Sequence, residues 1–384
     1  MDIIKMQKNM RILYVFRSLA IWGGIERILV EKMNNLVRMY GYEVFMLTAD
    51  QGEHPVPYQI DDRVQIEDLN IRFHLQFRHS GLFRLLDARE RSKRFDRLLT
   101  ARIKSIHPDV IVCTSDLYVN TLVRVKGDIP LVVEAHTNCT WSYYEGGLFQ
   151  KFNNWRMRRN LKKVDVLVAL TYGDADEWKH YCRNVIAIPN VVHLNPSGQC
   201  SDNSNKRVIY VGRFDERQKR VTDAISIWKK VHQQFPDWQL DIYGEGDDMA
   251  VVEYAVKQAS ANIYIHKPTK DIFDRYRESA FLILTSEFEP FGLVMPEAMS
   301  CGLPVVAFDC PYGPSEIITE GENGYLVPLH DDDRFVECMC KLMSDLKLRQ
   351  EMGQVAIGSS QKYSSVKIMP LWDDLFHKIV KSKT

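Results

Sequence analysis

The sequence predicts an α/β protein built from two doubly wound, Rossmann-like domains that face a central cleft. A chain of 384 residues with 45% hydrophobic residues is long enough to bury two separate cores. Short β-branched and apolar runs alternate with amphipathic stretches, which is the pattern of parallel sheets covered by helices. This alternation stops at a polar, turn-rich stretch near the middle of the chain and then begins again, which indicates two domains.

The first domain, residues 1–190, is expected to open with the strand Arg11–Phe16, a Gly-Gly loop and the helix Ile25–Arg38. We predict its later strands from short apolar runs bounded by polar or turn-forming residues. These strands are Val44–Thr48, Val110–Cys113, Leu131–Ala135, Val166–Leu170 and Ile186–Val192.

The stretch Asn195–Asn205 is rich in Asn, Ser, Pro and Gly, which favour turns over a packed core. We therefore predict that it ends the interdomain linker. The second domain, residues 191–365, then repeats the alternation of strand and helix. Its expected elements are the strand Arg207–Val211, the helix Thr222–Gln234 and the strands Gln239–Tyr243, Asn262–Ile265 and Phe281–Thr285.

The bulk composition narrows the class of protein. The formal net charge is zero, with 28 Lys and Arg against 22 Asp and Glu in residues 1–190 and the reverse imbalance in the remainder. The sequence holds no apolar run of roughly 18 residues, and its first nine residues are too polar for a signal peptide, so we expect a cytoplasmic protein. The eight cysteines form no C-x-x-C pair, which favours reduced structural thiols over a zinc site.

The segment Glu289–Glu297 is the most informative part of the chain. It places two carboxylates eight positions apart around Phe291 and Gly292, where a strand gives way to a helix. A helix N-terminus offers unpaired N–H groups to phosphate oxygens, and a loop glycine lets ligand atoms approach the main chain. Glu297 then suits the two hydroxyls of a ribose, and Glu289 suits hydroxyls of a sugar at the other end of a diphosphate. A capping carboxylate and a surface carboxylate explain this spacing equally well.

Two cations follow the first strand of the second domain. Arg213 comes just after that strand and Lys219 six residues later, so both can approach one diphosphate and stabilise the charge of a leaving group. Solvated basic residues in a charged loop are the alternative interpretation. Gly244 and Gly246 form a Gly-x-Gly turn at the end of a later strand, which fits either a nucleotide site or a plain turn.

The first domain offers weaker signals. Gly23 and Gly24 follow its first strand and open a helix, where N–H donors and small residues suit a diphosphate. Their spacing is neither a dinucleotide fingerprint nor a P-loop, and a tight strand-to-helix turn is an equal alternative. His136 ends another strand of this domain, and a lone histidine in such a place is more often structural.

In order and spacing, these segments resemble the donor-binding core of the family 4 glycosyltransferases, which are retaining enzymes with a GT-B fold and an E-x7-E signature. The resemblance rests on Glu289–Glu297, Gly302–Asp309, Pro311–Ile318 and Glu322–Val327, and it extends over nearly the whole chain. It implies that the amphipathic Ile368–Val380, within residues 366–384, crosses back onto the first domain.

The resemblance also implies roles for individual residues. The basic pair of the family falls on Arg213 and Lys219, although its usual Glu-Lys-Gly reads Gln218-Lys219-Arg220 here. The family histidine near the donor sugar falls on His136. We therefore predict as catalytic residues Glu289, His136, Arg213 and Lys219. The predicted donor-binding residues are Gly23, Gly24, Arg213, Lys219, Gly244, Gly246, Lys267, Pro268, Glu289, Phe291, Gly292, Leu293 and Glu297.

Metal binding is not expected. Asp331–Asp333 looks at first like the Asp-rich metal site of glycosyltransferases with the GT-A fold. It precedes the amphipathic Phe335–Met343, so helix capping explains it better. Because Arg213, Lys219 and helix N–H groups can hold the diphosphate, we expect no metal and no cofactor apart from the donor substrate.

Basic residues with interleaved aromatic and leucine side chains fill residues 72–104 and 151–163. Such helices either lie on an anionic bilayer or are ordinary solvated faces. Nucleic-acid binding is not expected, because the whole chain is neutral and no recognised module is present. Enzymes that resemble this chain often extend a lipid-linked oligosaccharide at the inner face of a bacterial membrane, which implies peripheral contact with that surface.

We therefore predict a retaining transferase that moves a hexose or N-acetylhexosamine from a nucleoside diphosphate sugar, UDP-linked, to a saccharide hydroxyl. The resemblance implies a lipid-linked oligosaccharide acceptor in surface-polysaccharide synthesis. Two alternatives stay open: a UDP-sugar epimerase with the same fold, and a non-catalytic subunit that binds sugar nucleotides.

Overall fold

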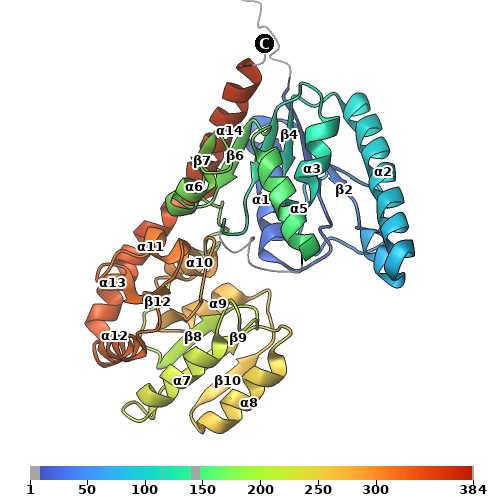
Figure 1. The fold of residues 1–384 in the computed structure, drawn as a ribbon. Helices are drawn as coiled ribbons and strands as arrows, with labels where there is room; N and C mark the ends of the chain where they lie inside the picture. Colours follow the sequence, from blue (N-terminus) through green and yellow to red (C-terminus); the bar gives the residue numbers. More distant parts are fainter. Residues whose placement is uncertain (1–8, 115, 140–147, 383–384) are drawn as a thin grey trace, which may run out of the picture. The chain divides into compact units, whose positions relative to one another are not determined.

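The computed structural model describes residues 9–114, 116–139 and 148–382, so most of the opening segment assessed for a signal peptide lies outside the described residues. Contacts divide the chain into two compact units, Met1–Val191 with Met369–Thr384, and Val192–Ile368 (Figure 1). Each unit is a parallel sheet covered by helices. The predicted fold class of two doubly wound α/β domains is confirmed.

The first unit holds a seven-stranded parallel sheet in the order β3-β2-β1-β4-β5-β6-β7. Its strands are β1 (Arg11–Phe16), β2 (Glu43–Thr48), β3 (Gln65–Asp68), β4 (Val110–Cys113), β5 (Leu131–Glu134), β6 (Val166–Ala169) and β7 (Val185–Ala187). Its helices are α1 (Gly24–Tyr40), η1 (Phe73–Arg78), α2 (Gly81–Ile106), α3 (Asp116–Val125), α5 (Leu148–Leu161) and α6 (Tyr172–Trp178). Strands β4, β5 and β6 are buried at every position, as expected where helices cover both faces of a sheet.

The second unit holds a six-stranded parallel sheet in the order β10-β9-β8-β11-β12-β13. Its strands are β8 (Arg207–Val211), β9 (Gln239–Tyr243), β10 (Ile263–His266), β11 (Phe281–Leu284), β12 (Val305–Asp309) and β13 (Gly324–Pro328). Its helices are α7 (Val221–His232), α8 (Met249–Ala259), α9 (Ile272–Arg277), α10 (Val294–Ser300), α11 (Gly313–Ile317), α12 (Asp332–Ser344), α13 (Leu346–Ser360) and η2 (Gln361–Tyr363). Trp228 of α7 and Phe335 of α12 are fully buried in its core.

The two sheets share one strand order. Numbered within its own unit, the second sheet runs 3-2-1-4-5-6, which is the order of a doubly wound dinucleotide-binding fold, and the first runs the same way with a seventh strand added at the end. The order reverses between β1 and β4 in the first unit and between β8 and β11 in the second. In such sheets ligands bind outside the carboxyl ends of the strands at the point of reversal, so the topology alone marks one candidate position in each unit.

Helix α14 (Ser365–Lys381) is shared between the units. It begins in the second unit, and its residues from Met369 onward belong to the first. There Trp372 and Phe376 are buried, and Tyr42 Oη donates to Asp373 Oδ1. The C-terminal helix thus returns to the first domain as predicted. In the described part of the chain, no helix is both long and apolar enough to span a bilayer.

Two boundary predictions are wrong. The predicted strand Ile186–Val192 shortens to β7, because Pro189 has no N–H to continue a ladder. The predicted linker Asn195–Asn205 belongs to the second unit. Asn203 is buried there and donates through Nδ2 to the carbonyl oxygens of Ala280 and Gly302 at 2.9 and 3.0 Å. Hydrogen bonds to neighbouring backbone therefore let these polar residues pack.

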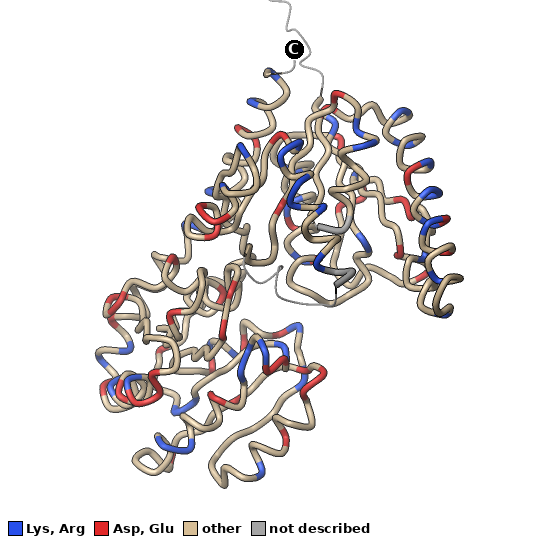
Figure 2. The backbone as a smooth tube through the Cα atoms, in the orientation of Figure 1, with Lys and Arg blue, Asp and Glu red and all other residues tan. Residues whose placement is uncertain are grey.

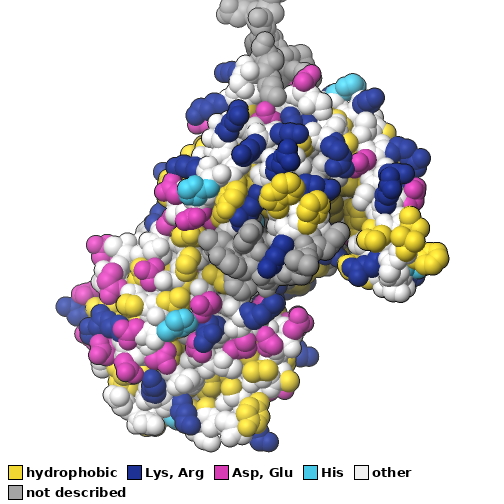
Figure 3. Space-filling model, in the orientation of Figure 1, with side chains coloured by type: hydrophobic (Ala, Val, Ile, Leu, Met, Phe, Trp, Pro, Cys, Tyr) yellow, Lys and Arg dark blue, Asp and Glu magenta, His cyan; other side chains and the backbone are white. Residues whose placement is uncertain are grey.

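The amino-terminal part of α2, with the preceding η1, exposes large apolar side chains. The exposed fractions are 63% for Phe77, 70% for Leu82, 75% for Phe83, 57% for Leu85 and 53% for Leu86. Basic residues follow along α2 and also occupy α5 (Figure 2). In the space-filling view, apolar and basic side chains lie together at the lower right end of the first unit (Figure 3). We call Phe77, Leu82, Phe83, Leu85 and Leu86 the α2 apolar surface.

Candidate active site

One predicted cation, Lys219, and the first predicted carboxylate, Glu289, meet at the point of strand reversal of the second unit. The loop that follows β8 carries Arg213 and Lys219, and the loop that follows β11 carries Glu289. Strands β8 and β11 are neighbours, with Phe281 paired to Val208 and Leu282 to Ile209. Because the strands are parallel, both loops leave the same edge of the sheet, which brings Lys219 and Glu289 together.

Lys219 and Glu289 form an ion pair. Lys219 Nζ donates to Glu289 Oε1, and Ser286 Oγ donates to the same oxygen at 2.8 Å. The Glu289 side chain is 4% exposed and that of Lys219 is 17% exposed. The pair therefore places a largely desolvated positive and negative charge side by side, an arrangement that strengthens any interaction with a charged ligand.

The Lys219 loop is held at several points. Tyr210 Oη donates to the Lys219 carbonyl oxygen at 2.9 Å, and the pKa of Tyr210 is raised well above its ordinary value by burial and by the nearby Glu289 charge. Glu287 N donates to the Gln218 carbonyl oxygen at 2.8 Å, which ties the β8 loop to the β11 loop. Arg213 is more loosely placed: its side chain is 66% exposed, with Nη2 at 3.3 Å from Gln218 Oε1.

Arg220 explains the departure from the family Glu-Lys-Gly pattern. Its backbone has a φ of 47°, in the left-handed region that glycine enters without steric cost. Arginine enters it here with its Nε 2.6 Å from Asp223 Oδ2 and 3.7 Å from Glu287 Oε2. Arginine therefore occupies a backbone conformation that suits glycine, and it places a guanidinium beside Glu287.

The Glu289 backbone is fixed by the segment after β12. Glu289 N donates to the Pro311 carbonyl oxygen at 2.9 Å, and the Glu289 carbonyl oxygen accepts from Gly313 N at 2.9 Å. A Cβ on Gly313 would lie 2.1 Å from the Phe291 carbonyl oxygen, so this close approach requires glycine. Sequence reasoning identified the carboxylate but missed Ser286 and Gly313, which set its position.

Gly244 and Gly246 have a structural explanation. A Cβ on Gly244 would lie 2.0 Å from the Gly212 carbonyl oxygen, and one on Gly246 would lie 2.2 Å from the Phe214 carbonyl oxygen. The loops after β8 and β9 therefore pack backbone to backbone at this edge. This packing accounts for the two glycines and leaves their contact with a nucleotide a prediction.

The second carboxylate of the motif lies in α10. Glu297 is in the first turn of this helix, is 2% exposed, and has Oε2 3.5 Å from Tyr276 Oη. Gly292 has a φ of 88°, which only glycine adopts readily, just before the helix begins. Phe291 is buried and Leu293 caps the helix. These residues lie on the same loop as Glu289.

Lys267 and Pro268 follow β10, at the outer edge of the second sheet, and both are exposed. Before them, His266 stacks on Tyr243 with ring centroids 4.5 Å apart, and its Nε2 lies 2.7 Å from Asp241 Oδ1. The segment is thus anchored by His266, while the two predicted site residues extend from the strand end.

In the first unit, Gly23 and Gly24 stand at the start of α1, as predicted. Gly23 caps the helix, and its carbonyl oxygen accepts from Tyr58 Oη at 2.9 Å. A Cβ on Gly23 would lie 2.2 Å from Glu26 Oε2, so the Glu26 side chain folds back over this cap. Burial raises the pKa of Glu26, which reduces its negative charge beside the loop.

His136 follows β5 and joins a buried charged cluster. Its Nε2 lies 3.2 Å from Glu134 Oε2, and Lys32 Nζ from α1 donates to that same oxygen. The side chains of all three residues are only 2–3% exposed. Lys32 was not predicted as a site residue, although a lysine among the apolar positions of α1 is a sequence signal that could have indicated it.

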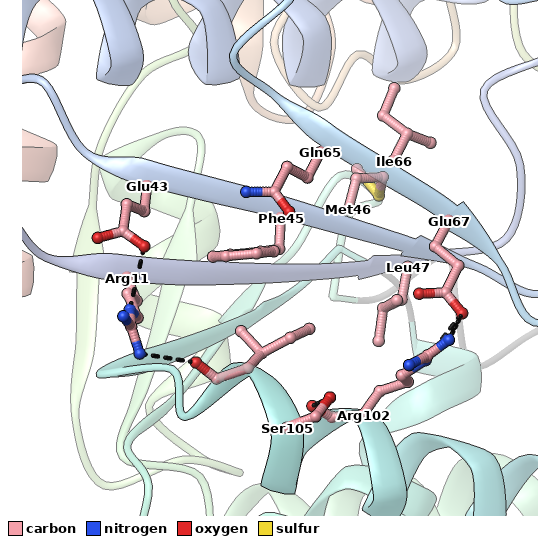
Figure 4. A pocket seen from close by; sticks show the side chains of 11 residues that line it. Arg11, Glu43, Phe45, Met46, Leu47, Gln65, Ile66, Glu67, Arg102 and Ser105 are labelled. Atoms are coloured by element: carbon pink, nitrogen blue, oxygen red, sulfur yellow. Dashed lines mark hydrogen bonds and ion pairs between the residues drawn. The ribbon is translucent and has the colours of Figure 1, made fainter.

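A hollow of about 410 Å³ lies elsewhere in the first unit (Figure 4). It runs along β2 from Glu43 to Leu47 and along β3 from Gln65 to Glu67, beside the last turns of α2. Its charges are already paired, Arg11 with Glu43 and Arg102 with Glu67. We therefore assign it no ligand.

Asp331 is the N-cap of α12, where its side chain accepts from Arg334 N at 3.0 Å. This confirms the capping interpretation of the aspartate run. Within residues 9–114, 116–139 and 148–382, no group of three or more His, Cys, Asp or Glu is placed to hold a metal ion.

The paired strand orders and the C-terminal helix that returns to the first unit define the class of proteins with the GT-B fold, and the Lys219–Glu289 pair lies at the ligand position of its second sheet. Models of two families match consecutive parts of the chain: one described as Glycosyltransferase Family 4 matches residues 22–195, and one described as Glycosyl transferases group 1 matches residues 205–345. The chain belongs to the group 1 glycosyltransferases of family 4, so the resemblance predicted from the sequence is confirmed.

Known proteins similar to the chain include an uncharacterized glycosyltransferase of Haemophilus influenzae, 25% identical over 361 residues, with 91% of this chain and 95% of the relative covered. The amylovoran biosynthesis glycosyltransferase AmsD of Erwinia amylovora is 32% identical over 228 residues, which cover 56% of this chain and 62% of AmsD. Among solved structures, a mutant of S. aureus TarM in complex with fondaparinux, alpha-GlcNAc-glycerol and UDP has a TM-score of 0.77 at 16% identity, covering 96% of this chain and 99% of TarM.

Proposed function

We propose that this glycosyltransferase moves a hexose or N-acetylhexosamine from a UDP-linked sugar to a saccharide hydroxyl, with retention of anomeric configuration and without a metal ion. The observation that carries the proposal is the Lys219–Glu289 pair at the point of strand reversal of the second unit, with Arg213 on the same loop. A diphosphate needs cations, and a sugar needs hydrogen-bond acceptors, at one place. Binding of UDP by the TarM complex, which shares the fold, supports the choice of nucleotide.

In the proposed reaction, every bond and proton is exchanged between the donor and the acceptor alone. The acceptor oxygen bonds to the anomeric carbon on the face that the diphosphate leaves, the bond from that carbon to the phosphate oxygen breaks, and a phosphate oxygen takes the acceptor proton. Arg213, Lys219 and the amides of Phe291, Gly292 and Leu293 would stabilise the charge that develops on the departing UDP. Glu297 would hold the ribose hydroxyls and His136 would support the donor sugar.

The surroundings of Glu289 support a binding role for this carboxylate. A retaining glycosidase attacks with a free carboxylate, but Glu289 Oε1 already accepts from Lys219 and Ser286. Such a carboxylate is a weak nucleophile and a good acceptor for sugar hydroxyls. When a diphosphate attracts Lys219, the donor to Glu289 Oε1 moves with it, which couples the sugar and phosphate parts of the proposed site.

We further propose that the acceptor is a lipid-linked oligosaccharide of surface-polysaccharide synthesis, reached at an anionic membrane. AmsD, an amylovoran biosynthesis enzyme, supports the polymer class. The α2 apolar surface supports the proposed membrane contact, because its five exposed apolar side chains lie near Arg84 and the further basic residues of α2. Apolar side chains that enter the acyl boundary, with cations at anionic headgroups, are the chemistry of an interfacial helix.

The test is incubation of the purified protein with a panel of UDP- and GDP-sugars in EDTA, with and without lipid-linked acceptor extract, followed by mass spectrometry of nucleotides and glycans. Acceptor-dependent release of UDP from one donor is the expected result. Conversion of the donor without acceptor would indicate an epimerase, and donor binding without turnover in any extract would indicate a binding subunit. Lys219→Ala and Glu297→Ala should each remove most transfer, whereas full activity in both would refute the site assignment.

A further inference from the structure

Lys32, Glu134 and His136 form a chain of contacts that the proposed reaction does not yet use. They come from α1, from the end of β5 and from the residue two positions later. Lys32 Nζ and His136 Nε2 both contact Glu134 Oε2, while Glu134 Oε1 has no hydrogen-bond partner among the described residues. Trp372 of α14 covers the other side of Lys32, with Nζ 3.9 Å from its ring centroid.

This cluster is a poor way to stabilise a fold. Removing a lysine and a carboxylate from water costs several kcal/mol per ion, and well-packed apolar residues of the same size often stabilise a protein as well or better. The oxygen Glu134 Oε1 and the hydroxyl of Tyr14, which is also buried nearby, lack partners within the described residues, which adds to the cost. The arrangement does, however, fix the state of each group within it.

The surrounding charges determine the protonation state of Glu134. Burial alone raises the pKa of Glu134, but the Lys32 charge and the contact with His136 outweigh it and lower this pKa overall. An ionised carboxylate has no proton to donate and can only accept. Among the described residues, the acceptor that contacts His136 is Glu134 from β5, and Lys32 from α1 and Tyr14 from β1 lie near that carboxylate.

The ionised Glu134 carboxylate then determines which ring nitrogen of His136 carries the proton. A neutral ring carries its proton on one nitrogen, and only an N–H can satisfy the Glu134 oxygen 3.2 Å away, so the proton belongs on Nε2. Nδ1 is left as an acceptor, and it makes no hydrogen bond with the residues that the structure describes. The complementary group is a hydroxyl, which a sugar supplies.

We propose that Lys32, acting through Glu134, is a positioning residue that holds His136 as the Nε2–H tautomer and so presents Nδ1 to a hydroxyl of the transferred sugar. This inference rests on the proposed function, in which His136 supports the donor sugar. Trp372 contributes by covering the Lys32 ammonium, so the cation is directed to Glu134 in place of water.

The tautomer is measurable without activity. In protein labelled with ¹⁵N-histidine, the ring signals missing from His136→Gln identify His136, and wild type should show the Nε2–H pattern at neutral pH. Lys32→Met should shift these signals toward the opposite tautomer, because the uncompensated buried Glu134 then takes up a proton and donates it to Nε2. Lys32→Arg keeps the charge and should keep the wild-type pattern.

Lys126→Met is the matched control. Lys126 is another largely buried lysine of the first unit, 9% exposed, with Nζ 3.1 Å from Asp165 Oδ2. Its loss should leave the His136 signals unchanged. A wild-type ring protonated on Nδ1 would overturn the inference even if Lys32→Met does not fold, and so would an unchanged ring pattern in a folded Lys32→Met.

A double-mutant cycle connects the tautomer to transfer. Lys32→Met should lower kcat/KM about tenfold, the value of one hydrogen bond to the sugar, but should have little further effect when His136 is already Gln. Additive losses would mean that Lys32 acts only on the fold and would refute the positioning role. If His136→Gln leaves transfer unchanged while the tautomer follows Lys32, the proposed role of His136 in the reaction fails and the geometric link to Lys32 stands.

Discussion

Replacing Lys219 by Met should destabilise the second unit as well as stop transfer. The change leaves the Glu289 carboxylate, 4% exposed, without its cation. Removal of one partner of a buried pair costs about 3–5 kcal/mol, and we expect about 3 kcal/mol because the Lys219 side chain is 17% exposed. For a unit of this size, that loss lowers Tm by about 6–12 °C.

A second substitution separates charge from packing. In Lys219→Met with Glu289→Gln, the neutral amide no longer needs a cation and can still accept from Ser286 Oγ, which lies 2.8 Å from the Glu289 oxygen. We expect the double variant to recover about 2 kcal/mol of the loss while transfer stays abolished. Differential scanning calorimetry of the full chain measures both variants.

The surface pair of Lys206 and Asp237 supplies the control. Both side chains are more than half exposed, so Lys206→Met should leave Tm essentially unchanged. The reasoning is refuted if Lys219→Met melts with wild type, or if the double variant is no more stable than the single one. Either result would mean that the ion pair is not coupled in the folded protein.

Three further predictions concern packing, pH and the membrane. Gly246→Ala should lower the free energy of unfolding in urea by about 1–3 kcal/mol, because its Cβ would lie 2.2 Å from a backbone oxygen. Gly358→Ala in α13, where a Cβ would have nothing within 4 Å, should raise that free energy by up to about 1 kcal/mol. Equal effects of the two substitutions would contradict the close approach at Gly246. The lowered pKa of Glu134 means that its contribution to stability is present above the ordinary carboxyl pKa and is lost as pH falls through the lowered value. Wild-type Tm should therefore fall more than that of Glu134→Gln as the pH is lowered from about 5 to about 3, and parallel curves would refute this. Phe83→Ser should weaken flotation with phosphatidylglycerol vesicles, while Tyr254→Ser, which removes a comparably exposed ring from α8 of the second unit, should not; equal flotation of both variants and wild type would count against the α2 apolar surface.

Much of the fold was predictable because its strands are buried on both faces. Val110–Cys113 and Phe281–Leu284 are unbroken apolar runs, and such runs have few other structures open to them. Strand β3, which reads Gln-Ile-Glu-Asp and lies at the sheet edge, carries no such pattern and was missed. The stretch around Asn203 was misjudged for a related reason, since composition does not reveal which distant carbonyl groups will satisfy a polar side chain.

The candidate site likewise has some features that the sequence predicts and others that depend on the fold. The sequence predicted Lys219 and Glu289 as candidates, because residue types at strand ends follow from the alternation of strand and loop. Their direct ion pair depends on which strands are neighbours, and that is a property of the sheet order. Lys32 and Glu134 lie 102 positions apart, so the sequence alone gave no reason to join them.

The contribution of α14 to the first unit constrains the order in which the two units can fold during synthesis. The first unit is incomplete until residues 369–382 supply Trp372 and Phe376 to its core, and these residues are synthesised after the whole of the second unit. On the ribosome, the second unit is therefore the first to have all of its chain, in reverse of the usual amino-to-carboxyl sequence of domain folding. A fragment cut at the boundary near Val191 would lack its own last helix, and a peptide spanning α14 is the piece that should rescue it in trans.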